Sequence, residues 1–84
     1  MLRVSVISPE QTVYEGEADS VVAPAYDGEV GILTRHAPML TLLGRGTLRV
    51  KAGGAERRFA VEGGFLQVAD DQVRVVTERA AAAG

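Results

Sequence analysis

Apolar and polar residues alternate along most of the chain. Leu2, Val4 and Val6 are separated by polar residues, and so are Leu48 and Val50. A period of two places the apolar side chains on one face of a β-strand. Strands are therefore predicted at 2–6, 12–15, 20–23, 29–33, 47–51, 56–61, 65–68 and 72–77, while no sustained helical period is found up to residue 78.

Proline, glycine and aspartate separate these runs. Pro9 ends the first run, because proline cannot donate a hydrogen bond to a neighbouring strand. Asp27-Gly28, Gly53-Gly54 and Asp70-Asp71 stand where tight turns are needed, and Asp-Gly and Gly-Gly readily supply the positive φ angles of hairpins. About eight to ten short strands with frequent turn signals predict an all-β fold, an antiparallel sandwich or barrel.

The composition limits what else the chain can hold. With 84 residues and 46% hydrophobic residues, it can pack one modest core. The absence of cysteine excludes disulfides and thiolate metal sites, and a single histidine, His36, excludes a multi-histidine metal site. Residues 1–78 are expected to form the sandwich domain. Residues 79–84 are expected to be a short C-terminal tail, either frayed or the start of a helix.

Charge and hydropathy narrow the class of partner. The formal net charge is −2, with nine basic residues scattered among eleven acidic ones. Nucleic-acid binding is disfavoured, because proteins that grip phosphates normally present a basic face. No apolar run approaches the roughly 20 residues that span a bilayer, and no signal peptide pattern opens the chain. A soluble cytosolic protein is expected.

No catalytic, cofactor or metal site is predicted. His36 is the one side chain suited to act as a base near neutral pH, but its sequence neighbours supply no nucleophile and no orienting carboxylate. The acidic residues show no metal-loop spacing, and the glycines between Gly28 and Gly31 lack the lysine and helix of a phosphate loop. A loop histidine that is structural or contacts a partner is the favoured interpretation.

Two segments do not fit a purely structural role. The first runs from Asp27 to Pro38 and is a polar, proline-terminated loop region that holds Glu29, Arg35 and His36. The second, 39–43, is apolar without strict alternation. Such a segment either lies in the core or presents apolar surface to a partner.

The sequence from Asp27 to Leu40, DGEVGILTRHAPML, resembles the signature of the ATP synthase epsilon subunit family, G-E-x-G-I-L/Y-x-x-H-A-P-L/M-L. The flanking segments 6–10, 14–16, 59–68 and 73–77 are similar to the opening strand, the glycine-marked strand pair and the closing strand of that family. The resemblance covers nearly the whole chain in the right order.

This resemblance implies a flattened antiparallel β-sandwich of two roughly five-stranded sheets. It also implies a non-catalytic central-stalk subunit of a proton-transporting, sometimes sodium-transporting, rotary ATP synthase. In the family this domain binds the gamma subunit, rests on the polar loops of the c-subunit ring and helps couple ion flow to ATP synthesis. The implied location is peripheral, at the cytoplasmic face of the bacterial cell membrane. No cofactor is expected.

Seven positions match partner-binding residues of the family. Glu29 matches an acidic residue that faces the ring loops, and Ser8 and His36 match residues at one end of the domain, near gamma and the ring. A short apolar segment matches one that lies toward gamma. The full set is Ser8, Glu29, Gly31, His36, Thr41, Leu42 and Leu43.

Family members typically continue into a helical hairpin that has no counterpart in the printed sequence, so inhibition and ATP binding are not assigned. Two other interpretations stay open at this point. One is a free-standing β-sandwich adaptor that binds another partner by strand addition or an apolar patch. The other is a small hydrolase that uses His36.

Overall fold

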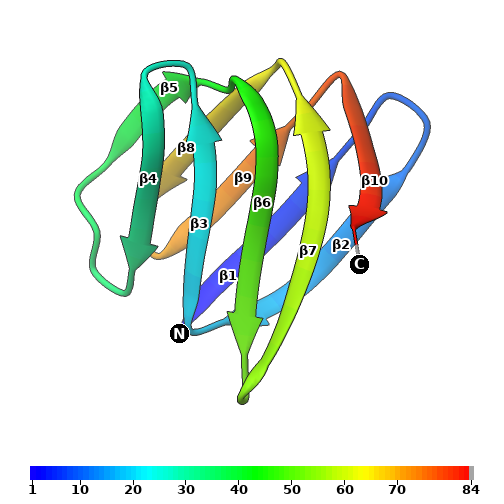
Figure 1. Cartoon of the computed structure of the whole chain (residues 1–84). Helices are drawn as coiled ribbons and strands as arrows, with labels where there is room; N and C mark the ends of the chain where they lie inside the picture. Colours follow the sequence, from blue (N-terminus) through cyan, green and yellow to red (C-terminus); the bar gives the residue numbers. More distant parts are fainter. Residues whose placement is uncertain (84) are drawn as a thin grey trace.

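Ten β-strands form two five-stranded sheets that pack face to face in the computed structural model, which describes residues 1–83 (Figure 1). This confirms the predicted all-β sandwich. Those residues contain no helix that could cross a membrane. The strands are β1 (Leu2–Ile7), β2 (Thr12–Ala18), β3 (Ser20–Ala25), β4 (Gly28–Leu33), β5 (Met39–Leu42), β6 (Arg45–Ala52), β7 (Ala55–Glu62), β8 (Phe65–Ala69), β9 (Gln72–Val76) and β10 (Arg79–Ala83).

Half of the adjacent strand pairs are consecutive in the chain, and the other half join strands that are far apart in the sequence. Sheet A has the order β2-β1-β9-β8-β5, and sheet B has the order β10-β7-β6-β3-β4. Every strand pair is antiparallel except β1 and β9, which pair in parallel with Val4 beside Val73. This pair departs from the predicted all-antiparallel arrangement. A parallel pair needs a long crossover, and here the chain passes through sheet B between the two strands.

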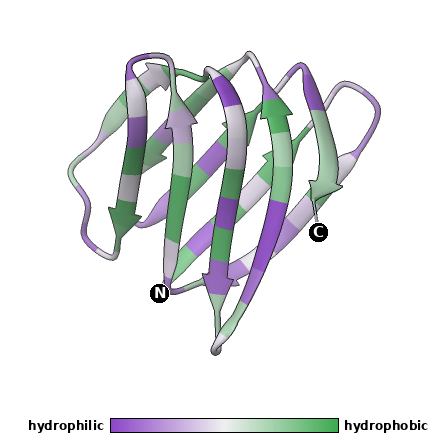
Figure 2. Cartoon of the chain, in the orientation of Figure 1, coloured by the Kyte–Doolittle hydropathy of each residue, from purple (hydrophilic) through white to green (hydrophobic). Residues whose placement is uncertain are grey.

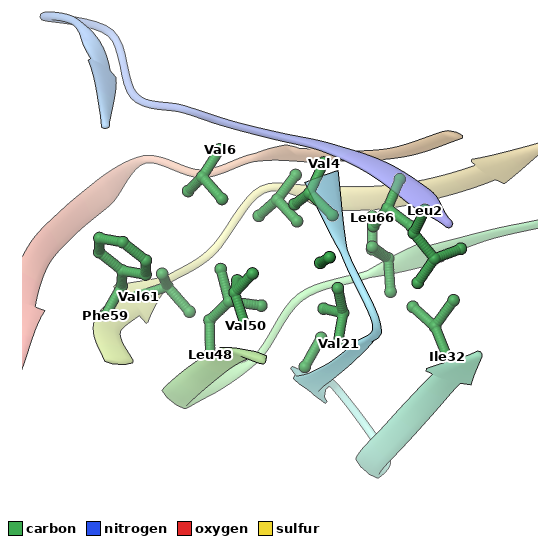
Figure 3. Close-up of a cluster of buried hydrophobic side chains, with 14 of the residues drawn as sticks. Leu2, Val4, Val6, Val21, Ile32, Leu48, Val50, Phe59, Val61 and Leu66 are labelled. Atoms are coloured by element: carbon green, nitrogen blue, oxygen red, sulfur yellow. The ribbon is translucent and has the colours of Figure 1, made fainter. Parts of the chain in front are cut away.

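The core fills the space between the two sheets (Figure 3). Sixteen apolar side chains, each no more than 5% exposed, meet there, and in Figure 3 those of β1 point toward those of β3, β4 and β6. Most are β-branched residues or leucines, which pack well on a pleated surface. Figure 2 shows the corresponding alternation of green and purple along the strands. Full burial of one such side chain contributes roughly 1.5–3 kcal/mol.

Thr77 is the one polar side chain buried within residues 1–83. Its hydroxyl oxygen lies 2.8 Å from the Arg79 carbonyl and 3.1 Å from the Glu62 carbonyl, and its amide donates to the Ile7 carbonyl at 2.9 Å. The residue therefore joins the end of sheet A to the beginning of β10 in sheet B. Because its hydroxyl and its amide both have partners, the burial of this residue is compatible with a stable core.

The predicted hairpin turns are confirmed at two places. Gly53 and Gly54 have φ of 58° and 83°, and Asp70 and Asp71 have φ of 51° and 61°. Both pairs adopt the left-handed conformation that two-residue hairpins of right-twisted strands require.

The C-terminal segment differs from the expected frayed or helical tail. Arg79–Ala83 form β10, which pairs with β7 along its whole length, from Arg79 beside Glu62 to Ala83 beside Arg58. The outer edge of β7 offers a row of unpaired backbone groups, whereas five residues are too few to nucleate a helix on their own. Gly84, the last residue of the expected tail, lies outside the described residues.

Candidate functional site

On four strands of sheet A, the alternation of apolar and polar residues breaks at the same end of the sheet. At each place two apolar residues follow each other, so that one side chain enters the core and the other points to the outer face of the sheet. The inward members are buried, while the outward members stay half-buried or, at Leu42, 63% exposed. The four pairs are Val6-Ile7, Leu42-Leu43, Phe65-Leu66 and Val75-Val76.

The register of the strands aligns the four outward side chains in one row. Ile7 lies beside Val76, Val76 beside Phe65, and Phe65 beside Leu42. The row crosses β1, β9, β8 and β5, and three inter-strand spacings give it a length of about 14 Å. Leu40, two residues before Leu42 and 70% exposed, extends it along β5. We call these five residues the apolar stripe.

Polar residues form the next row on the same face. One row away from Ile7, Val76 and Phe65 on the outer face, Ser5 lies beside Arg74 and Arg74 beside Gln67, while Leu40 continues this row on β5. An exposed apolar patch with a polar border is typical of a protein–protein interface, because the apolar part loses its contact with water and the border sets orientation.

The turn between β3 and β4 is fastened to the β5 end of the stripe. The Tyr26 amide donates to the Leu42 carbonyl at 3.0 Å, and Ala25 forms a bridge with Leu43. Tyr26 itself is exposed. Sheet B and sheet A are thereby joined at this corner, which is uppermost in Figure 1, and the hairpin that leads into Glu29 stands next to the stripe.

The predicted partner-binding residues on β4 face away from sheet A. Glu29 and Gly31 are exposed on the outer face of sheet B, since their neighbour Ile32 points into the core. One Glu29 carboxylate oxygen lies 3.5 Å from the Arg49 guanidinium, and the side chains of Arg49 and Glu29 are 38% and 59% exposed. Such a pair contributes little to stability and leaves the carboxylate free to bind another cation.

Ser8 and His36 lie at opposite ends of the sandwich, so the expectation that they share one end is wrong. Ser8 follows the end of β1 and its hydroxyl donates to the Gln11 carbonyl at 3.1 Å. The loop of His36 is tied to the other end, where the Arg35 amide donates to the Asp71 carboxylate at 2.6 Å and Asp71 precedes β9 beside the start of β1. The length of β1 separates them by about 20 Å. Because β4 runs from the Tyr26 end to the opposite end, a residue that follows it must lie there.

The segment 41–43 divides between the core and the surface. Leu43 is buried, Thr41 is half-buried and Leu42 points outward, so Leu42 is the one of the three that presents an apolar side chain to a partner. The sequence prediction missed the other members of the stripe as contacts. Their signal was the pairs of consecutive apolar residues, which break the alternation at the ends of four strands.

No constellation suited to catalysis is found in residues 1–83. The ring nitrogen Nδ1 of His36 lies 2.7 Å from the carbonyl of its neighbour Ala37, and no group of three potential metal ligands is found in this range. The pKa of the Glu56 carboxyl is lowered by a hydrogen bond from the Arg58 guanidinium at 2.7 Å. This pair lies on sheet B, away from the stripe.

Comparisons with known proteins agree with the epsilon-type resemblance. The model of the ATP synthase delta/epsilon chain β-sandwich domain matches residues 1–83. The epsilon chain of Leptospira borgpetersenii is 46% identical over 80 residues, which are 95% of this chain and 63% of the relative. The epsilon chain of Frankia casuarinae is 48% identical over 80 residues, 94% of either chain.

A solved structure shows the same fold. A chain of the Euglena gracilis mitochondrial ATP synthase, from a structure described as OSCP/F1/c-ring, superposes with a TM-score of 0.90 at 23% identity over 96% of this chain and 52% of that chain. The chain thus spans about six-tenths of the Leptospira relative and half of the Euglena chain, while it spans nearly all of the Frankia relative. The predicted family and the predicted sandwich are both confirmed.

Proposed function

Because the chain belongs to the ATP synthase delta/epsilon β-sandwich family, we propose that it is a non-catalytic subunit of the central stalk of a rotary ATP synthase. In this role it binds the gamma subunit and the c-subunit ring, turns with both and couples proton flow to ATP synthesis. It is peripheral to the membrane and is held at the cytoplasmic face through these partners.

The apolar stripe carries the proposal and is the surface we assign to gamma. A subunit that transmits torque has to stay attached, and apolar burial is the term that supplies most of the affinity of such contacts. The stripe is built into a rigid sheet, with Phe65 and Val76 on central strands. A partner that covers it gains apolar contact without ordering a loop, which reduces the entropic cost of binding.

The corner that bears Glu29 is the surface we assign to the polar loops of the ring. Glu29 is exposed and only loosely paired with Arg49. A carboxylate at the rim of an interface fixes orientation and accelerates association more than it adds affinity. Basic side chains on the ring loops would therefore select this orientation of the sandwich on the ring.

Reconstitution of the synthase tests the proposal. A synthase that lacks this chain is supplied with the purified chain, and ATP-driven proton pumping is measured together with ATP hydrolysis. The chain is expected to co-purify with gamma and the ring and to raise the number of protons pumped per ATP hydrolysed. Failure to co-purify, while the remaining subunits assemble, contradicts the proposal.

A further inference from the structure

Arg74 occupies the centre of the outer face of sheet A. It lies on β9, the middle strand of the sheet, and its side chain is exposed on the same face as that of Val76. Its cross-strand neighbours are Ser5 on β1 and Gln67 on β8. Along β9 its neighbour on this face, two residues before it, is Gln72. These three nearest polar neighbours are uncharged, and the charged residue diagonal to Arg74 is Arg3, which lies beside Gln72 on β1.

Within residues 1–83, no carboxylate forms an ion pair with Arg74. Arg3 is the other basic residue on the strands of sheet A, and it lies 3.8 Å from Glu15. Glu15 also ends the row that contains Arg74, but it is two strands away, about 10 Å. The free domain thus presents one unpaired guanidinium on the middle strand of a sheet whose other basic residue, Arg3 on β1, is already paired with Glu15 on β2.

The distance from Arg74 to the apolar stripe decides whether a partner bound to the stripe also contacts Arg74. Arg74 is two residues from Val76, about 7 Å along the strand. A standard interface covers about 800 Å² on each partner, which is far more than the stripe alone offers. A partner seated on the stripe therefore also covers the row of Ser5, Arg74 and Gln67.

A guanidinium that loses its water on binding must gain an acceptor from the partner, because an unpaired buried charge is strongly unfavourable. A carboxylate suits this need best, since it can accept two parallel hydrogen bonds from the guanidinium fork. Resting on the proposed binding of gamma to the stripe, we propose that Arg74 is the specificity-determining residue of this interface. The gamma surface presents a carboxylate opposite it, one row away from the apolar contact.

The test measures the dissociation constant of the complex with the gamma subunit of the same organism by isothermal titration calorimetry at two salt concentrations. Arg74→Gln is expected to weaken binding about 30-fold or more, and Arg74→Glu further, because the partner carboxylate then meets a like charge. Arg74→Lys is expected to recover part of the loss, since it restores the charge without the fork. Arg45→Glu is the matched control, an exposed arginine on the outer face of sheet B, and it is expected to bind within two-fold of the unaltered chain.

The outcomes separate this inference from the proposed function. If the unaltered chain fails to bind gamma, both the proposed function and the role of Arg74 are contradicted. A second outcome is that the unaltered chain binds gamma, that Leu42→Glu abolishes binding, and that Arg74→Glu binds as tightly as the unaltered chain. This outcome supports the assignment of the apolar stripe to gamma and contradicts the role of Arg74. Circular dichroism of each variant checks that the sandwich is folded. Arg74 is exposed, so its replacement leaves the core intact.

Discussion

Leu42 and Phe65 lie directly opposite each other on the antiparallel pair of β5 and β8, and both point to the outer face of sheet A. The residues that follow them in the chain, Leu43 and Leu66, enter the core. At the same level of the sheet, each of these two neighbouring strands thus places one apolar side chain in the core and one on the surface. This pair forms the β5 end of the apolar stripe, and it connects the packing of the domain to its proposed attachment to gamma.

Replacement of Gly64 by alanine is expected to destabilise the sandwich by about 2–4 kcal/mol. Gly64 has φ of 97°, and an added Cβ would lie 2.7 Å from the Thr77 Cα, against backbone that cannot move aside. Gly31→Ala is the matched control, because a Cβ there meets open space, and it is expected to change the free energy of unfolding by less than about 0.5 kcal/mol. Urea unfolding of both variants measures the difference, and equal stabilities would contradict this account of the Gly64 turn.

Replacement of Thr77 by valine is expected to cost about 1–2 kcal/mol in the free energy of unfolding, although it keeps the volume of the side chain. The hydroxyl proton lies within hydrogen-bonding distance of the Arg79 and Glu62 carbonyls at the junction of the two sheets, and these carbonyls lose that donor in the variant. Thr47→Val on the exposed face of β6 serves as the control, with an expected change below about 0.5 kcal/mol. If Thr77→Val lowers the free energy of unfolding no more than Thr47→Val does, the hydrogen bonds of the Thr77 hydroxyl do not contribute to stability.

The pH dependence of the Glu56–Arg58 pair has a definite sign. The hydrogen bond from Arg58 lowers the pKa of Glu56 from its usual value of 4.5. The pair therefore stabilises the folded state at pH values above the unfolded pKa, and the stabilisation is lost as the pH falls through the lower folded value. Carbon-detected NMR titration is expected to find the Glu56 pKa raised in Arg58→Gln. An unchanged pKa in that variant would refute the assigned cause.

Replacement of Glu29 by glutamine is expected to weaken attachment to the ring without unfolding the domain. The Glu29–Arg49 pair is exposed and 3.5 Å long, so its loss should change the free energy of unfolding by less than about 0.5 kcal/mol. Proton pumping per ATP hydrolysed is expected to fall in the reconstituted synthase. Glu62→Gln, exposed on the same outer face, is the control and is expected to pump like the unaltered chain. If Glu29→Gln pumps as many protons per ATP hydrolysed as Glu62→Gln, the assignment of Glu29 to the ring contact is contradicted.

Much of the fold could be predicted because its signals are local. Alternation located the strands, and Gly53-Gly54 and Asp70-Asp71 located two hairpins, since positive φ depends on the residues of the turn themselves. The parallel pairing of β1 with β9 could not be predicted in this way, because it joins residues about 70 apart in the chain through packing alone. The strand at Arg79–Ala83 was missed for the same reason: its alanines carry no alternation, and the edge of β7 decides their conformation.

The candidate site was predictable only in part. The resemblance to the epsilon family pointed to Leu42 and Glu29, and both are exposed in the structure. Ile7, Phe65 and Val76 become a single surface only when the register of four strands is known, because they are far apart in the chain. The opposite placement of Ser8 and His36 likewise depends on the direction in which β4 runs, which no local signal fixes.

The affinity of the chain for gamma, with and without a charge in the stripe, tests the central claim most directly. Leu42→Glu and Leu33→Glu are matched, because the two leucines are 63% and 65% exposed on the outer faces of opposite sheets. Calorimetry with the gamma subunit is expected to show that Leu42→Glu weakens binding at least 100-fold, as expected when a charge is buried at an apolar contact, and that Leu33→Glu binds within two-fold of the unaltered chain. Undiminished binding by Leu42→Glu, with both variants folded, would contradict the assignment of the apolar stripe to gamma.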